Sequence, residues 1–387
     1  MDVKKNAYML ILLLGLVSLF GDIAYEGTRG ISGQYLGILG ASATIIGLVS
    51  GLGEFLGYGL RFVSGYFADK TKNYWAFAFI GYGLIIAIPL LAFANNWQIA
   101  AALIILERIG KGLRSPARDT ILSHGAKEVG RGWGFAIHEF MDQIGAIIGP
   151  LIFAGILAAR GSYKEAFAVM LIPVILCVVV LFVARRKFPD TAKLEKEEKR
   201  NTAKANRTFW LYTLFIFLSV AGFASFQLIG YHLKVNAIFP DDQIPVLYAI
   251  AMGVDAIFAL GIGKVYDKIG IVAIIAIPLF TLPIPFLAFT SSYWMIIAAV
   301  VLWGAVMGVH ETIMRAAIAD IMPLAKRGTA YGIFNASYGL ALLFGGAVIG
   351  YMYDHNALLI SPFVVLMQVL SIPIFVVLMR NVHSSGS

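Results

Sequence analysis

The sequence predicts an all-α membrane protein whose twelve transmembrane helices form two pseudo-symmetric six-helix bundles. Three observations support this fold class. Hydrophobic residues make up 59% of the 387 residues and charged residues only 13%, whereas soluble domains have about 25% charged residues. Apolar runs of about 20 residues, the length that crosses the hydrocarbon core of a bilayer, recur along the chain. Two landmarks of the first half also return in the second half at nearly one offset.

The apolar runs are separated by short polar turns, and we expect each run to be one transmembrane helix. The first run is too long for a cleavable signal peptide and lacks a small-residue cleavage site, so it should stay as a helix. The twelve predicted spans are 8–38, 43–68, 74–94, 97–118, 132–158, 164–184, 208–233, 244–266, 271–290, 293–319, 328–353 and 358–379.

A long polar segment between the sixth and seventh runs defines the predicted domain division. It mixes Lys, Arg and Glu without apolar periodicity, which is typical of a cytoplasmic linker. We therefore predict an N-terminal bundle over 1–187, a linker over 188–207 and a C-terminal bundle over 208–382. Residues 383–387 resemble an artificial tail left by an expression vector.

The two halves share landmarks that indicate an internal duplication. Segment 65–70 reads Gly-Tyr-Phe-Ala-Asp-Lys after the second run, and segment 263–268, which starts with Gly and ends in Asp-Lys, follows the eighth run 198 residues later. An Arg-Gly pair at 131–132 precedes the fifth run, and another at 327–328 precedes the eleventh run 196 residues later. Two independent landmarks at nearly one spacing favour duplication.

The distribution of basic residues predicts the orientation. Of the 30 Lys and Arg residues, 22 fall in loops and ends on one side of the predicted helices and 3 on the other side. By the positive-inside rule, both termini are cytoplasmic in a multi-pass protein of a prokaryotic cell membrane. This bias and contact with anionic lipid explain the net charge of +8, so nucleic-acid binding is not expected.

Charged residues near the middle of the first run are the strongest functional signal. Asp22, Glu26 and Arg29 are spaced by four and three residues, which places them on one helical face. Ionised groups at bilayer depth are costly and normally face a bundle interior or a water-filled cavity, where they mark an ion or substrate path. We therefore expect this face to take part in proton coupling or substrate binding.

Further polar groups in the N-terminal half extend this candidate site. On the fourth run, Arg108 needs a carboxylate partner, and Asp22 or Glu26 are the expected ones, because a guanidinium does not deprotonate in proteins. Residues 107, 111, 114 and 118 form one charged stripe that cannot face lipid. The proton-coupling and substrate set predicted from the sequence is Asp22, Glu26, Arg29, Glu54, Arg108, Lys111, His138 and Asp142.

The C-terminal half carries fewer charges within its predicted helices. Its aromatic and amide groups are better suited to shaping a pocket than to moving protons. Glu311 and Arg315 are spaced as a neutralised pair, but we also place Glu311 near the pocket. The predicted pocket residues of this half are Phe223, Gln227, Tyr231, Glu311, Asn335 and Tyr338.

The loops and motifs together resemble the major facilitator superfamily. The Gly-x-x-x-Asp-Lys segments resemble its signature loop, residues 108–112 resemble its fourth-helix motif, and Gly145 to Pro150 resembles the Gly-Pro motif of its proton-driven antiporters. Segments 22–26, 107–119 and 138–142 together resemble those of a poorly characterised archaeal and bacterial subgroup of this superfamily.

This resemblance implies two domains of inverted triple-helix repeats around a central cavity that opens alternately to either side. It also implies a cytoplasmic latch between the domains. From the residues alone, Asp69 and Asp267 could accept hydrogen bonds from a helix N-terminus or pair with a cytoplasmic arginine such as Arg114 or Arg131, or they could only shape turns. The latch residues implied by the resemblance are Gly65, Asp69, Lys70, Arg114, Arg118, Asp267 and Lys268.

The leading functional hypothesis is a proton-coupled antiporter that exports small organic or amphipathic molecules. Acidic groups in a largely aromatic cavity suit such cargo. One alternative is a divalent metal transporter that uses Asp22, Glu26, His138 and Asp142 as ligands. Another is an importer of an anionic solute, with Arg29, Arg108 and Lys111 as its binding residues.

Other protein classes fit the sequence less well. A membrane enzyme would need a clustered nucleophile and base near an interface, and no such signature is present. A scaffold or sensor would have little use for charges inside its helices. We therefore expect a monomeric transporter, not an enzyme, without cofactor or resident metal, whose partners are a small molecule or ion, protons and lipid.

Overall fold

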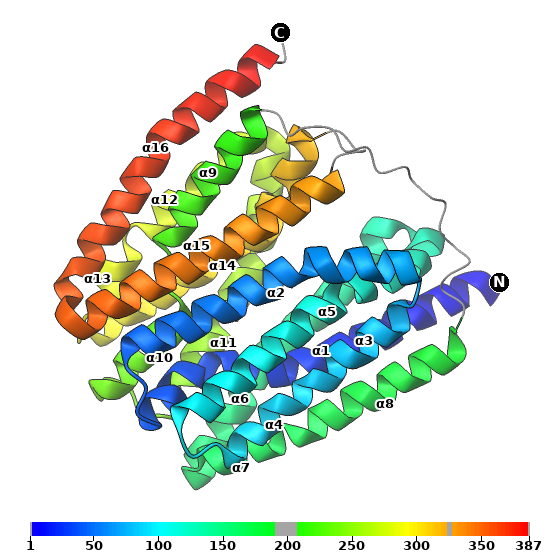
Figure 1. Ribbon diagram of the computed structural model, residues 1–387, viewed down its shortest axis with the longest axis horizontal. Coiled ribbons are helices and arrows are strands. Elements are labelled where there is room, and N and C mark those ends of the chain that lie inside the picture. The colour runs from blue at the N-terminus through cyan, green and yellow to red at the C-terminus, as the bar shows by residue number, and fades with distance from the viewer. Residues whose placement is uncertain (1, 190–206, 323–326, 386–387) are drawn as a thin grey trace. The chain divides into compact units, whose positions relative to one another are not determined.

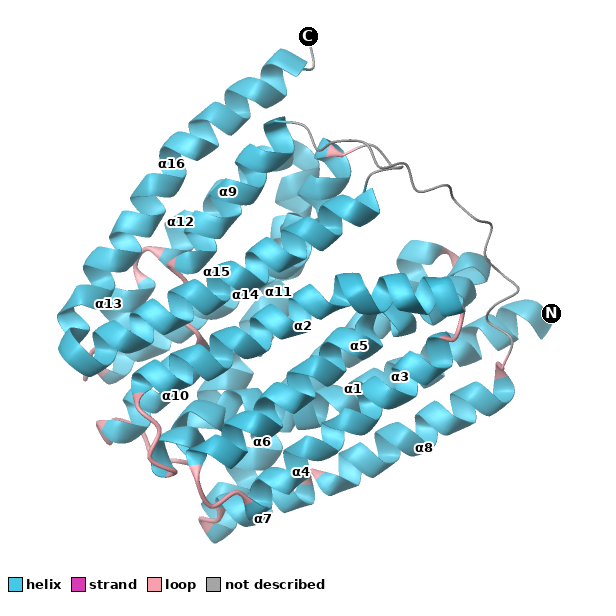
Figure 2. Cartoon of the chain, viewed as in Figure 1, coloured by secondary structure: helices cyan, strands magenta, loops and turns pink. Residues whose placement is uncertain are grey.

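The computed structural model describes residues 2–189, 207–322 and 327–385, and these residues are almost entirely helical (Figures 1 and 2). Most of the predicted linker 188–207 lies outside the described residues. Nine helical stretches of the described chain are long and apolar enough to cross a membrane. Two of them, Gln243–Ala288 and Arg327–Val382, each contain two predicted runs, and the charged fourth run is not among the nine. The expected count of twelve is therefore not confirmed.

The first half of the chain forms long helices joined by short turns. Asn96 begins α5 by accepting a hydrogen bond from the backbone N–H of Ile99, and Gly161 ends α6 in the left-handed region at φ +63°, where a glycine is favoured. The helices are α1 (Asp2–Ile38), α2 (Ala43–Thr71), α3 (Tyr74–Gly83), η1 (Leu84–Ile86), α4 (Ala87–Leu90), η2 (Leu91–Phe93), α5 (Trp97–Val129), α6 (Arg131–Arg160), α7 (Tyr163–Val169) and α8 (Leu171–Lys187).

The second half also contains breaks within its apolar runs. Proline residues interrupt the region between α11 and α14, because a proline lacks the N–H that continues a helix. The helices are α9 (Arg207–Ala221), α10 (Phe226–Val235), α11 (Gln243–Ile269), η4 (Gly270–Ile275), α12 (Ala276–Thr281), α13 (Ile284–Ala288), α14 (Tyr293–Ile321), α15 (Arg327–Asn356), η6 (Ala357–Leu359) and α16 (Ile360–Ser385).

The described chain packs into two compact units. The first unit comprises residues 2–40, 56–189 and 239–249. The second unit comprises residues 41–55, 207–238, 250–322 and 327–385. In the first unit, α1 packs against α5, α6 and α8; in the second, α9 packs against α15 and α16 (Figure 1). Residues 41–55 of α2 thus pack with helices of the second half.

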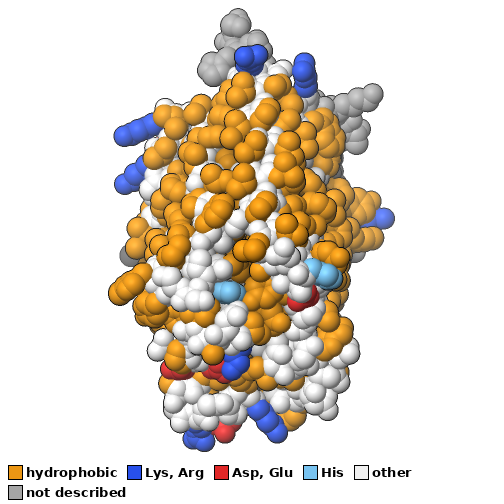
Figure 3. Space-filling model, turned by 90° about the vertical axis from the view of Figure 1, so that its left-hand side faces the viewer, with side chains coloured by type: hydrophobic (Ala, Val, Ile, Leu, Met, Phe, Trp, Pro, Cys, Tyr) orange, Lys and Arg blue, Asp and Glu red, His pale blue; other side chains and the backbone are white. Residues whose placement is uncertain are grey.

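Large apolar side chains are exposed on the protein surface, as a bilayer requires. Figure 3 shows one face on which hydrophobic side chains predominate and charged side chains lie mainly near its upper and lower margins. Trp294, Leu260 and Ile257 are each exposed by about three quarters, at 76%, 75% and 74%. Exposed apolar surface on this scale is typical of contact with lipid.

Candidate functional site

Glu26 of α1 lies at the centre of the polar cluster in the first unit. Only 7% of this residue is exposed. Its carboxylate lies 3.8 Å from the ammonium of Lys111 on α5 and 3.6 Å from the guanidinium of Arg29, one turn further along α1. The phenol of Tyr248, in the N-terminal part of α11, donates a hydrogen bond of 2.5 Å to the same carboxylate. The predicted face of α1 therefore holds a buried carboxylate with two cations and a phenol around it.

Gly30 gives Tyr248 room to approach α1. A Cβ atom at Gly30 would lie only 3.0 Å from the Tyr248 ring and 3.1 Å from the Cβ atom of Tyr248. A side chain at this position would therefore displace the ring that carries the phenol. Sequence reasoning missed Tyr248, because a tyrosine within an apolar run gives no signal that it will contact a residue 222 positions away.

The two basic residues expected to meet α1 both lie over one aromatic ring. The Arg108 guanidinium lies 4.3 Å, and the Lys111 ammonium 3.6 Å, from the ring centre of Tyr25, which is 2% exposed. We expected Asp22 or Glu26 to pair with Arg108. The ion pair from α5 to Glu26 comes from Lys111, and the Nε atom of Arg108 lies 4.0 Å from the carboxylate of Glu107.

In the charged stripe of α5, Glu107 and Arg114 are buried, whereas Lys111 and Arg118 are half-buried. Glu107 and Arg114 form a 3.0 Å ion pair across two turns, with side-chain exposures of 5% and 4%. Arg114 also donates to the carbonyl of Gly81 on α3 at 3.4 Å. A pair of Asp69 with Arg114 is one of the options that the sequence leaves open; in the structure Arg114 pairs with Glu107, and Asp69 accepts a 3.4 Å hydrogen bond from Tyr74.

The C-terminal end of the stripe meets a second polar cluster on α6. Arg118 lies 2.9 Å from Asp119 and 3.6 Å from Asp142, and it donates to the hydroxyl of Ser18 at 3.1 Å. His138 lies 2.8 Å from the same hydroxyl through Nε2 and 3.6 Å from Asp142 through Nδ1. Ser18 therefore links the fifth and sixth helices to α1.

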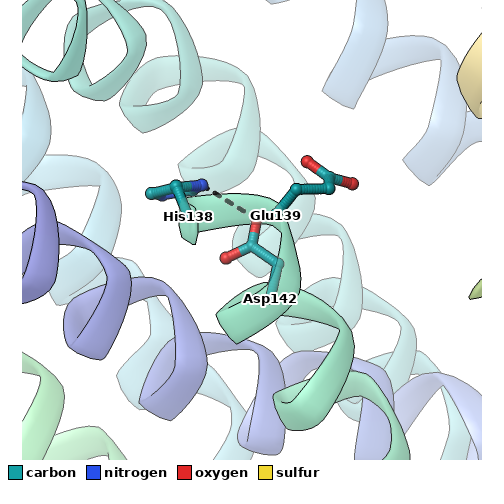
Figure 4. Close-up of side chains that lie close together, drawn as sticks. All are labelled: His138, Glu139 and Asp142. Atoms are coloured by element: carbon teal, nitrogen blue, oxygen red, sulfur yellow. Dashed lines mark ion pairs between the residues drawn. The ribbon is translucent and has the colours of Figure 1, made fainter. Parts of the chain in front are cut away.

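His138, Glu139 and Asp142 form the group that could hold a metal ion among the described residues. One ligand atom of each lies within 4.8 Å of the others. Figure 4 shows His138 and Asp142 pointing toward one another, while the Glu139 carboxylate extends to the other side. The metal set expected from the sequence also included Asp22 and Glu26, which are not in this group. The guanidinium of Arg118 beside Asp142 competes with a cation there.

The remaining predicted residues belong to other parts of the fold. Glu54 is buried but packs in the second unit with residues 41–55. The predicted latch residues Asp267 and Lys268 are exposed at the end of α11, where the adjacent Tyr266 donates a 2.6 Å hydrogen bond to Asp320. Gly65 and Lys70 lie near the C-terminal end of α2. The side chain of Arg131 lies outside the described part of the structure.

The predicted pocket residues of the C-terminal half lie in the second unit and differ in their burial. Phe223, Gln227 and Tyr338 are buried in the second unit, whereas Glu311 and Asn335 are half-buried. Tyr231 lies against Tyr353, with ring centres 5.7 Å apart. The pocket set omitted His310, which the structure places between Phe223 and Tyr338.

Comparisons with known proteins are consistent with a transporter. A family model described as Major Facilitator Superfamily matches residues 11–346 and 239–384. An uncharacterized protein of Mycobacterium tuberculosis is 38% identical over 358 residues, which cover 90% of this chain and 88% of that protein. An uncharacterized MFS-type transporter of Methanocaldococcus jannaschii is 27% identical over 365 residues, 91% of this chain and 89% of its own.

The fold also matches solved structures of transporters. The crystal structure of the nucleoside transporter NupG aligns with a TM-score of 0.72 and 17% sequence identity, covering 98% of this chain and 99% of that one. A POT family transporter in complex with 5-aminolevulinic acid aligns with a TM-score of 0.72 and 16% identity, covering 96% and 95%. At these identities the likeness concerns the fold alone.

Proposed function

Because this chain belongs to the major facilitator superfamily, we propose that it is a proton-coupled secondary transporter that exports small organic or amphipathic molecules by alternating access. Its family and its structural neighbours are transporters, not enzymes. Proton coupling, direction and cargo are the parts that we propose. Both termini are proposed to be cytoplasmic, and the domain division is proposed at 188–207.

One observation carries the proposal of proton coupling: the buried Glu26 carboxylate is held by Lys111, Arg29 and Tyr248. A bound proton removes the charge that attracts both cations, and it also weakens the hydrogen bond that the phenol donates. The proton affinity of a carboxylate depends on its burial and on nearby charge. A change in the distance between α1, α5 and α11 during transport therefore couples to proton binding at Glu26.

The cluster around Arg118 supplies a second site for charge changes on the same helices. Arg118 contacts Asp142, and both Arg118 and His138 contact the hydroxyl of Ser18. Movement of α6 relative to α5 would separate Asp142 from Arg118 and leave a buried carboxylate without its counter-charge. Such a group gains from binding a proton, because isolated buried charge is costly.

The experiment is proton movement in liposomes that contain the purified protein. The lumen is buffered acidic and holds the pH-sensitive dye pyranine, and ethidium is added outside as the organic probe. An antiporter lets protons leave as ethidium enters, so the lumen pH rises with ethidium. We expect Glu26→Gln to abolish this rise while the variant stays folded. An equal rise in wild type and Glu26→Gln would contradict the role of Glu26.

The His138, Glu139 and Asp142 group favours a second candidate, a divalent metal ion as cargo. The same liposomes distinguish the two candidates when Mn²⁺ replaces ethidium. A rise in lumen pH with Mn²⁺ that is lost in Asp142→Asn, without a response to ethidium, would favour metal transport. A response to ethidium alone would favour the organic cargo.

A further inference from the structure

One apolar stretch of the second unit contains a break in its helix, and side chains of other helices donate hydrogen bonds to the backbone there. Within the candidate span Arg207–Val235, α9 ends at Ala221 and α10 begins at Phe226. The Trp303 indole donates to the carbonyl of Ala224 at 3.0 Å, and the Gln368 amide donates to the carbonyl of Ser219 at 2.9 Å. Non-helical backbone at membrane depth persists only where protein or a water-filled cavity satisfies it. This break is therefore a fixed feature.

His310 of α14 lies beside the break and has one ring nitrogen without a partner. The residue is 5% exposed. Its Nδ1 lies 3.0 Å from the hydroxyl of Tyr338 on α15, whereas its Nε2 is buried and has no hydrogen bond within the described chain. Buried polar atoms of folded proteins almost always have a partner. The Nε2 atom is a donor if the Tyr338 hydroxyl donates to Nδ1, and an acceptor if it accepts from Nδ1.

The imidazole ring of His310 contacts two aromatic side chains. Its ring meets Phe223 edge-on at 5.2 Å and Tyr338 edge-on at 5.7 Å. Phe223 belongs to the break, and its ring is stacked on Trp303 at 5.4 Å. Aromatic walls favour flat rings, which they bind by stacking or edge-on contact, and a few convergent polar atoms then fix the orientation. The break, α14 and α15 thus place one free hydrogen-bonding atom in a ring that contacts Phe223 and Tyr338, with Trp303 stacked on Phe223.

We infer that His310 binds the transported molecule through Nε2, and that the rings of Phe223, Trp303 and Tyr338 select flat aromatic molecules with an uncharged hydrogen-bonding group at the ring edge. This inference rests on the proposed transport function, because it assigns the substrate class of the second unit. His310 acts here as a binding residue, and Tyr338 holds its ring in position.

The test measures thermal stabilisation of the purified full-length protein by a planar probe, 2-quinolone. Ligands that bind the folded state raise its unfolding temperature. Decahydroquinolin-2-one keeps the amide but is not flat, and naphthalene is flat but has no hydrogen-bonding group. We expect 2-quinolone to stabilise the wild-type protein at concentrations at least about tenfold lower than either control compound, since a hydrogen bond is worth up to about tenfold in affinity.

Two variants separate binding by Nε2 from a structural role of the ring. His310→Asn places an amide near the position of Nδ1, where it can keep the contact with Tyr338, and His310→Gln places one near Nε2. We expect Asn to weaken 2-quinolone binding about tenfold and Gln to keep it within about threefold. Equal binding by wild type and the Asn variant, or no preference of the wild type for 2-quinolone, would overturn the inference. Either failure leaves the ethidium-dependent proton movement and its dependence on Glu26 as a separate result.

Discussion

The phenol of Tyr248 donates a 2.5 Å hydrogen bond to the carboxylate of Glu26. Tyr248 belongs to α11 of the second half, yet residues 239–249 pack in the first unit with α1. The bond therefore fixes the beginning of α11 to the helix that carries the central carboxylate. A hydrogen bond to an ionised group is worth about 1.5–3 kcal/mol, so it can bias the position of α11 substantially.

Tyr248→Phe keeps the ring beside Gly30 and removes only the donor. We expect faster hydrogen exchange of the backbone amides of residues 243–249, by about tenfold or more, because the hydrogen bond to a charged group is lost. Hydrogen exchange with mass spectrometry measures this effect. Tyr351→Phe is the matched control, since Tyr351 is an exposed ring stacked on His355. Unchanged exchange in Tyr248→Phe would mean that the bond does not hold α11.

Asp22→Asn and Glu26→Gln should each abolish probe-dependent proton movement in liposomes. The amides preserve the size of the side chains but cannot take up and release a proton at neutral pH. Circular dichroism and the unfolding temperature show whether each variant is folded. Glu165→Gln is the control, because Glu165 is exposed and pairs with Arg160 away from the cluster. Wild-type proton movement in both neutral variants would remove these carboxylates from the mechanism.

The face of α1 could be predicted from the sequence because its residues are close in the chain. Spacings of four and three place Asp22, Glu26 and Arg29 on one helical face, and the charged stripe of α5 contains the buried ion pair of Glu107 and Arg114. Membership of the major facilitator superfamily was also predicted and is confirmed by the family match. These features depend on local periodicity and short motifs, which a sequence displays directly.

Contacts between residues that are far apart in the sequence could not be predicted in the same way, because they depend on tertiary packing. Helical geometry places Arg108 on a different face from Glu107, but it gives no sign that the aromatic ring of Tyr25 packs against the Arg108 guanidinium. Tyr248 and His310 lie in apolar runs, where an aromatic or a single histidine is usually part of the core. Residues 41–55 gave no sign that they pack with α15, since glycines record a close approach but not its partner.

Glu107→Gln should destabilise the protein by about 3–5 kcal/mol, because it leaves the buried guanidinium of Arg114 without its counter-charge. The double variant Glu107→Gln with Arg114→Met removes both charges and should recover much of the loss. Thermal unfolding of wild type, both single variants and the double variant measures the coupling. Strictly additive effects would show that the 3.0 Å ion pair does not contribute to stability.

Gly47→Ala should disrupt the contact between α2 and α15 in the second unit. A Cβ atom at Gly47 would overlap the carbonyl oxygen of Gly346, and one at Gly51 would lie 2.6 Å from the Cα atom of Leu343. The backbones therefore touch along this seam, and an added methyl group must push them apart at a cost of about 1–3 kcal/mol.

The matched control for this seam is Gly59→Ala, on the same helix, where a Cβ atom would meet nothing within 4 Å. The helix-propensity gain of alanine over glycine should raise or preserve the unfolding temperature of this control. In Gly47→Ala the same gain is present, so any fall in unfolding temperature measures the steric cost.

Asp354 of α15 also accepts hydrogen bonds from the backbone of Ala43 and Thr44 at 2.9 and 2.8 Å. Increased hydrogen exchange at these amides in Gly47→Ala would place the disruption at the seam, whereas equal stability of the two alanine variants would show that α2 and α15 can separate without cost.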